Sequence, residues 1–223
     1  MPGPAPRAAS TRQVRAQHVL FMQAVELDIT RVDSIRRVAA ELIERFPALN
    51  VLVNNAGIMP FDDASAAIDD TVAQAIIDTN LLGPVRMTSA LIGHLKRQPR
   101  AVVLHNTSVL AYVPLAGNAV YSATKAALHA YALSQRFMLR KTSVRVQEIA
   151  PPWVDTDLIH QNGDPRAMPP RDFIEQTMRE LASDREEVTV EAVRPLRDNP
   201  GAGKHAFFNA FNEQLEADPI PVA

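Results

Sequence analysis

A phenol and an amine stand four residues apart in the run Tyr121-Ser122-Ala123-Thr124-Lys125. At the start of a helix this spacing places both side chains on one face, so that they can reach the same reactant. A Lys charge about 5 Å from a phenol, at an effective dielectric of about 20, lowers the pKa of the phenol by roughly two units. The pair therefore predicts an acid/base group usable near neutral pH, although a chance pairing of Tyr and Lys gives the same spacing.

A hydroxyl group lies thirteen residues before this phenol, at Ser108, soon after the apolar run 101–104. A hydroxyl at the carboxyl end of a parallel strand faces the crevice in which open α/β sheets bind ligands. There it can hydrogen-bond a substrate carbonyl as charge builds up on the oxygen. The alternative interpretation is that Ser108 only caps or turns the loop 106–111.

Short apolar runs alternate with longer segments of helical period from Gln23 onward. This alternation is typical of βαβ units and predicts an α/β fold with a Rossmann-like, doubly wound parallel sheet. A helix over 70–96 carries Pro84 in its interior, where a missing backbone hydrogen bond should bend it close to Asn80. The predicted strands are 24–27, 50–53, 101–104, 144–149 and 188–190, and the other predicted helices are about 29–46, 121–140, 171–181 and 205–215.

The size and composition of the chain suit a single domain. It has 223 residues, 47% of them hydrophobic, which is enough for one buried core. We expect residues 1–22 to be weakly ordered and residues 23–223 to form the domain, with a substrate lid within about 157–182, centred on the loop 157–168.

Several classes of function are disfavoured by the same composition. A formal charge of -2 leaves no electrostatic footprint for nucleic acid or an anionic membrane, and a chain without cysteine has no disulfide and no thiolate metal site. The six histidines have no spacing to Asp or Glu that defines a metal site. Without a signal-peptide core or a long apolar run, the sequence predicts a soluble, cytoplasmic protein, and its partner is expected to be a small molecule or another protein.

Five motifs follow one another along the chain. They are Asn54-Asn55-Ala56-Gly57 after a strand, Asn80 in Asn-Leu-Leu-Gly, Thr107-Ser108, Tyr121-x-x-x-Lys125, and the run from Pro151 to Thr156. Their order and spacing resemble those of the short-chain dehydrogenase/reductase family. Within that family, the run 150–158 and the stretch that starts at Pro165 look most like the DltE-type oxidoreductases. The resemblance covers about residues 23–198.

The resemblance implies a role for each matching residue. Tyr121 would exchange a proton with the substrate, and Ser108 would orient the substrate oxygen. Lys125 would lower the pKa of the phenol and hold the nicotinamide ribose, while Asn80 would anchor a water in a proton relay. Asp28 would meet the adenine, Ala56 and Gly57 would lie beside the adenosine ribose, and Thr156 would contact the nicotinamide amide. The implied cofactor-binding residues are thus Asp28, Asn54, Ala56, Gly57, Tyr121, Lys125, Pro151 and Thr156.

The chain departs from the family pattern near its start. The family's Thr-Gly-x-x-x-Gly-x-Gly turn, which lets the backbone approach a pyrophosphate, is absent, and only Gly3 precedes Gly57. We therefore expect a Rossmann-like sheet that lacks its first strand–helix unit, and weak dinucleotide binding. Pro152 also stands where the family usually has Gly, which removes one backbone N–H.

Loss of a central first strand would leave the strand 50–53 without a neighbour. Either the strand 24–27 pairs with it directly, or an apolar edge stays open and invites dimerisation or aggregation. A gene fragment or a wrong start codon would explain the same sequence.

These observations predict an enzyme that uses NADP or NAD to interconvert a small alcohol and its ketone or aldehyde. The family resemblance implies a homodimer or homotetramer. The alternative is a catalytically silent homologue or fragment that binds no cofactor and serves as an interaction subunit.

Overall fold

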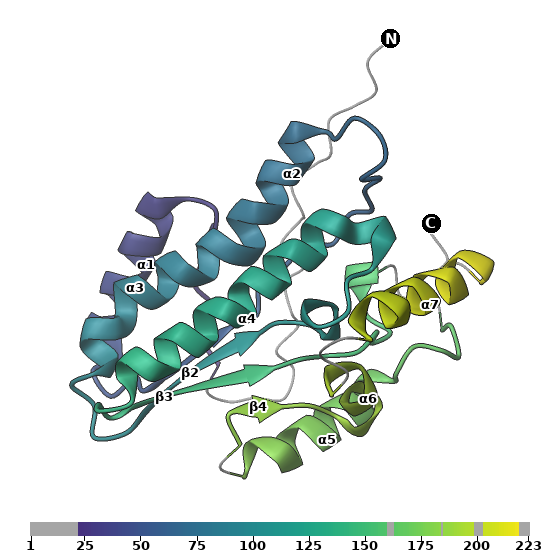
Figure 1. Ribbon diagram of the computed structural model, residues 1–223. Helices are drawn as coiled ribbons and strands as arrows, with labels where there is room; N and C mark the ends of the chain where they lie inside the picture. The colour runs from purple at the N-terminus through teal and green to yellow at the C-terminus, as the bar shows by residue number, and fades with distance from the viewer. Residues whose placement is uncertain (1–21, 160–162, 184, 199–202, 219–223) are drawn as a thin grey trace.

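The computed structural model describes residues 22–159, 163–183, 185–198 and 203–218. Its centre is a four-stranded parallel sheet in the order β1-β2-β3-β4 (Figure 1). The predicted α/β Rossmann-like fold is confirmed, whereas the segment predicted to be weakly ordered lies almost wholly outside the described residues. The strands are β1 (Val51–Asn54), β2 (Ala101–Asn106), β3 (Val144–Ile149) and β4 (Glu187–Val188).

Two helices cover one face of the sheet, α3 (Gly83–Leu95) and α4 (Ala119–Leu139), and α1 (Val32–Arg45) packs against α3 (Figure 1). The apolar stripes of α3 and α4 pack on the inward side chains of the strands, as the helical period predicts. The helices α5 (Pro170–Leu181), α6 (Arg194–Arg197) and α7 (Lys204–Ala217) lie outside this layer. Residues with less than 2% exposure in this core include Ile35, Leu91, Leu95, Val103 and Ala132.

The helix predicted over 70–96 consists of three segments. After α2 (Asp70–Ile77), whose first turn is capped by the Asp69 carboxylate, comes a π-helical turn, η1 (Asp78–Leu82), and then α3. Pro84, which lacks an N–H, lies in the first turn of α3, directly after the π-turn. The irregularity of the helix therefore lies close to Asn80, where the sequence predicted it, and the bend itself stays a prediction. Turns of the π type occur frequently at functional sites, and this one holds Asn80.

The segment predicted as strand 24–27 forms no strand, so that prediction is wrong. Val25 and Ile29 pack against the core beside α1 and α3 instead. A Cβ added to Gly83 would lie 2.6 Å from Ile29 Cγ1 and 3.0 Å from its carbonyl oxygen. Glycine at position 83 therefore lets this segment lie directly against the junction of η1 and α3, which draws it away from the sheet.

Among the described residues, β1 is consequently an edge strand with one covered face. Leu52 and Asn54 are buried, but Val51 and Val53 remain 48% and 52% exposed. Of the two arrangements considered, the open edge is the one observed.

A second apolar cluster lies at the carboxyl ends of the strands, where the loops and α7 meet. It includes Leu115 and Tyr121, and Trp153 and Leu215 pack against it. In the part of the chain that the structure describes, no helix is long and apolar enough to cross a membrane.

Candidate active site

The fold brings Ser108, Tyr121 and Lys125 into one buried group. Ser108 follows the carboxyl end of β2, while Tyr121 and Lys125 occupy the first turns of α4. All three side chains are buried, with 7%, 3% and 4% exposure. Ser108 also caps the short helix η2 (Val109–Ala111), since its Oγ accepts from the Leu110 N–H at 3.1 Å. The capping interpretation of this serine is correct, and it does not prevent the hydroxyl from also meeting the phenol.

The Tyr121 phenol is held in its neutral form. Burial raises its pKa to about 12, and the hydrogen bond with Ser108 acts in the opposite direction. The sequence-based expectation that Lys125 brings this pKa toward neutrality is wrong for the structure as it stands. Lys125 Nζ lies 5.4 Å from the centre of the Tyr121 ring, and desolvation of the phenolate outweighs this neighbour.

The Lys125 ammonium is tied to the end of β2. Its Nζ donates to the Asn106 carbonyl oxygen at 2.8 Å. Burial lowers its pKa to about 8, so it is still mostly protonated at neutral pH. An ammonium has three N–H donors, and this bond uses one of them.

Asn80 holds the loop that follows β1. Its Oδ1 accepts from the Ile58 N–H and its Nδ2 donates to the Ile58 carbonyl, both at 2.9 Å, and the residue is fully buried. A Cβ added to Gly57 would lie 3.5 Å from Asn80 Oδ1 and 3.8 Å from Lys125 Nζ. The structure thus brings Asn80, Gly57 and Lys125 together. The water-anchoring role of Asn80 stays a prediction.

The remaining residues predicted to bind cofactor differ in their burial and in their contacts. Asn54 is buried, and its amide contacts Thr88 Oγ1 at 2.9 Å and His105 Nδ1 at 3.3 Å, so it joins β1 to α3 and β2 rather than facing a crevice. Ala56 and Thr156 are exposed. Pro151 accepts a backbone hydrogen bond from Val109 at 2.9 Å, which fixes the loop after β3 beside η2.

Asp28 lies apart from this group. Its carboxylate accepts from the Thr30 N–H and hydroxyl at 2.9 and 2.7 Å, which lowers its pKa, and its own N–H donates to Ser34. None of these hydrogen bonds joins it to Gly57 or Lys125. Its contact with adenine stays a prediction.

The loop predicted as a lid is anchored at its base. Val154 and Met168 form a bridge, and the Asp155 N–H donates to the Met168 carbonyl at 3.0 Å. Residues 160–162 lie outside the described residues, and α5 lies beside β4 (Figure 1). The movement of a lid over the strand ends stays a prediction.

Sequence reasoning missed a buried ion pair directly behind the site. Glu148 of β3 is fully buried, and both of its carboxylate oxygens lie 2.9 Å from His129 Nδ1, one turn beyond Lys125 on α4. Thr107, the residue before Ser108, donates its hydroxyl to the same carboxylate at 2.7 Å. The pair raises the pKa of His129. Nineteen residues separate the partners, so only the strand register could have revealed the pair. Among the described residues no cluster has the composition of a metal site.

Comparison with known proteins agrees with this geometry. The sequence profile of the family described as short chain dehydrogenase matches residues 4–167. The chain is 38% identical over 178 residues to the uncharacterized oxidoreductase DltE of Bacillus subtilis, covering 77% of this chain and 71% of that protein. The chain therefore belongs to the short-chain dehydrogenase/reductase family of oxidoreductases and is of the DltE-like type.

A second relative and a solved structure resemble the chain less closely. The NADPH-dependent 1-acyldihydroxyacetone phosphate reductase of Schizosaccharomyces pombe is 36% identical over 155 residues, which cover 67% of this chain but only 51% of the reductase. A short chain dehydrogenase from Burkholderia cenocepacia, solved in complex with NADP, superimposes with a TM-score of 0.73 at 27% identity, covering 86% of this chain and 80% of that one.

Proposed function

We propose that this chain is a nicotinamide-dependent oxidoreductase that interconverts a small alcohol and its ketone or aldehyde. The observation that carries the proposal is the buried group of Ser108, Tyr121 and Lys125 at the carboxyl end of β2. A serine hydroxyl, a neutral phenol and an ammonium in one crevice can orient an oxygen, exchange a proton with it and stabilise the charge that develops.

The residues present fit the nicotinamide-ribose end of such a cofactor. Lys125 has two N–H donors beyond its bond to Asn106, and Asn106 Oδ1 is buried with no hydrogen-bond partner among the described residues. A ribose hydroxyl both donates and accepts, which matches this pair of unused groups. A relative that is 27% identical has been solved with NADP, which supports a nicotinamide dinucleotide as the cofactor.

For the pyrophosphate end of the cofactor, the described residues offer no equivalent binding groups. No described segment offers a glycine-rich turn leading into a helix, and the exposed face of β1 lies on the side of the sheet where the unit carrying it is expected. We therefore expect binding that depends mainly on the nicotinamide end and has a dissociation constant in the millimolar range.

In this proposal the cofactor, when bound, supplies or accepts the hydride. Tyr121 donates its phenolic proton to the substrate oxygen in reduction and takes it back in oxidation. Ser108 donates a hydrogen bond to the same oxygen and fixes its position. Lys125 favours the transient phenolate through its positive charge, and Asn80 keeps the Gly57 loop beside Lys125.

Fluorescence titration of the purified chain with NADPH and with NADH tests the proposal. Trp153 is the single tryptophan and packs against the cluster that contains Tyr121, so binding should alter its emission. Lys125→Met should weaken the response, and Lys141→Met, on the loop before β3, is the matched control. A flat titration to 10 mM with both nucleotides, under conditions in which the chain is folded, would contradict the proposal.

A second candidate function follows from the lack of a described segment that could bind the pyrophosphate. A chain that keeps Ser108, Tyr121 and Lys125 but does not bind cofactor would act as an interaction subunit, for which the exposed Val51 and Val53 are suitable contact groups. The flat titration described above, together with self-association that depends on these two valines, would favour this candidate.

A further inference from the structure

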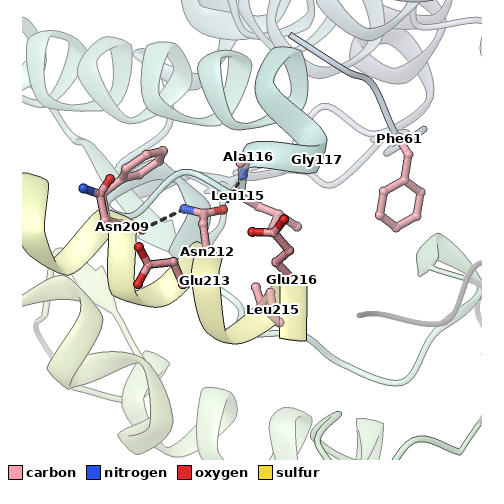
Figure 2. A pocket seen from close by; sticks show the side chains of 10 residues that line it. Phe61, Leu115, Ala116, Gly117, Asn209, Asn212, Glu213, Leu215 and Glu216 are labelled. Atoms are coloured by element: carbon pink, nitrogen blue, oxygen red, sulfur yellow. Dashed lines mark hydrogen bonds between the residues drawn. The ribbon is translucent and has the colours of Figure 1, made fainter. Parts of the chain in front are cut away.

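A cleft of about 620 Å³ lies between α7, Phe61 and the segment 115–117 (Figure 2). This segment belongs to the loop that runs from Ser108 to Tyr121, and Gly117 is one helical turn before Tyr121. Leu115 belongs to the same packed cluster as Tyr121, and Leu215 of α7 packs against that cluster. The cleft is therefore linked to the proposed site through this loop and this packed cluster, and it has the volume typical of a small-molecule pocket.

The body of the cleft is apolar. Its apolar side chains are those of Phe61, Leu115, Phe208 and Leu215, and two small residues of the loop complete this wall. Figure 2 shows Phe61 on the far side of the opening from α7. Such a lining favours an aromatic or aliphatic group over a sugar or a phosphate.

One amide fixes the two walls relative to each other. Asn212 of α7 donates to the Pro114 carbonyl at 3.1 Å and to the Phe208 carbonyl at 2.9 Å, and its oxygen accepts from the Ala116 N–H. Both N–H groups and the oxygen are thus occupied by protein. Asn212 shapes the cleft and has little left to offer a ligand.

The charge on the cleft comes from two carboxylates. Glu213 and Glu216 of α7 line it, both are exposed, and neither has a hydrogen bond or an ion pair among the described residues. No described lining residue is basic. Two unpaired carboxylates at about 6 Å repel a bound anion by about tenfold in affinity in water at low salt.

From these observations we propose that the cleft binds the non-reacting end of the substrate. The occupant is an apolar group, aromatic or aliphatic, that is neutral or positively charged, and Glu213 and Glu216 discriminate against carboxylates and phosphates. This proposal rests on the function proposed above, because it assigns the cleft to the substrate of the same site.

Three matched acetophenones test the proposal: 4-acetylbenzamide, 4-(aminomethyl)acetophenone and 4-acetylbenzoate. Their dissociation constants are measured from the NMR shifts of labelled Leu115 and Leu215 methyl groups, without nucleotide and at low salt. The amide and the amine should bind, with the carboxylate about tenfold weaker. The difference should fall to about twofold in the double variant Glu213→Gln, Glu216→Gln and in 0.5 M salt.

Two further variants make this result specific. The double variant Glu44→Gln, Glu191→Gln removes two exposed charges elsewhere and should leave the tenfold difference unchanged. Gly117→Leu should weaken all three ligands at least tenfold by filling the cleft. A Cβ at this position would meet Phe61 Cδ1 at an ordinary 3.8 Å, so the backbone can accept a side chain.

The outcomes separate this proposal from the proposed function. The same ketones are also incubated with NADPH, and oxidation of the NADPH is followed by absorbance. Methyl shifts without NADPH oxidation would retain the cleft as a binding site and overturn the proposed enzyme activity. NADPH oxidation without shifts at Leu115 and Leu215 would retain the enzyme and overturn the cleft. The cleft proposal is also overturned if no ligand binds at 10 mM, or if the carboxylate discrimination survives in the Glu213/Glu216 variant.

Discussion

The two sides of the candidate site, at the carboxyl ends of the strands, differ in how completely they are built. On the α4 side, Ser108, Tyr121 and Lys125 are buried, and the helix is tied to β2 by Lys125 and Asn106. On the β1 side, among the described residues, Val51 and Val53 face away from any covering element. The groups suited to proton transfer thus lie together, whereas the described residues contain no glycine-rich turn that could bind a pyrophosphate.

This difference teaches that the two halves of the site are encoded by separate parts of the chain. The motifs of the α4 side fall within residues 101–156, and the first turn of α4 is also held from outside this range by the Asp62 carboxylate, which accepts from the Ala119 and Val120 N–H groups at 2.8 Å. Among the described residues, no strand–helix unit covers the exposed face of β1. The following predictions test whether the α4 side acts independently of the other.

Tyr121→Phe should have the largest effect. Removal of the phenolic proton should lower kcat for carbonyl reduction by about 10²- to 10⁴-fold, the usual contribution of a general acid. Tyr131→Phe removes a phenol from the same helix and should leave kcat within about twofold, since its hydroxyl has only one long contact, with Gln135 at 3.4 Å. Equal losses of kcat in both variants would mean that the substitutions disturb α4, and would contradict a role of the Tyr121 phenol in proton transfer.

His129→Leu should destabilise the α4 side of the site. It leaves the fully buried Glu148 carboxylate without its histidine partner, which we expect to cost about 2–4 kcal/mol in the free energy of unfolding. Urea denaturation measures the change, with Ser134→Ala on the exposed part of α4 as the control. A loss below about 0.5 kcal/mol would mean that Glu148 finds another partner.

Substitutions on the two faces of β1 should have unequal costs. Leu52→Thr, on the covered face, should lower the free energy of unfolding by about 2–3 kcal/mol. Val53→Thr, on the exposed face, should change it by less than about 0.5 kcal/mol and should reduce any self-association seen in sedimentation. Similar losses in the free energy of unfolding at both positions would show that the face of β1 with Val53 is also covered, and would contradict the stated difference between the α4 side and the β1 side.

The pH dependence of stability should carry a smaller effect of the same ion pair. The bond to Glu148 raises the pKa of His129, so its stabilisation is complete below the ordinary value of 6.5 and is lost as pH rises through the raised pKa. The stability difference between wild type and His129→Leu should therefore shrink from pH 6 to pH 9. A difference that grows with pH would contradict the assignment of charge to His129.

Much of this fold was predictable because its elements are local. The helical stripes and the strands 101–104 and 144–149 carry their own periodicity, and the spacing of Tyr121 and Lys125 sets their common face. The prediction of a strand over 24–27 failed because this segment packs on the core only through Val25, while Leu27 stays 38% exposed, and Ile29, just beyond the segment, lies against Gly83.

What the sequence could not supply were contacts between distant segments. The spacing of His129 and Glu148 does not predict their ion pair. The sequence of α7 likewise does not predict that Asn212 contacts the loop before Tyr121. The pKa of the Tyr121 phenol was likewise misjudged, because its burial appears only in three dimensions and opposes the effect of the nearby ammonium.

Deuterium transfer tests the central claim most directly. The chain is incubated with 4-deuterated NADPH, in both stereochemical forms and at 10 mM, and with a panel of neutral aryl and alkyl ketones, and the alcohols are analysed by mass spectrometry. We predict deuterium at the carbinol carbon from one of the two forms, with the transfer lost in Tyr121→Phe. No deuterated alcohol from any ketone, with a chain shown to be folded, or equal transfer by Tyr121→Phe, would contradict the account.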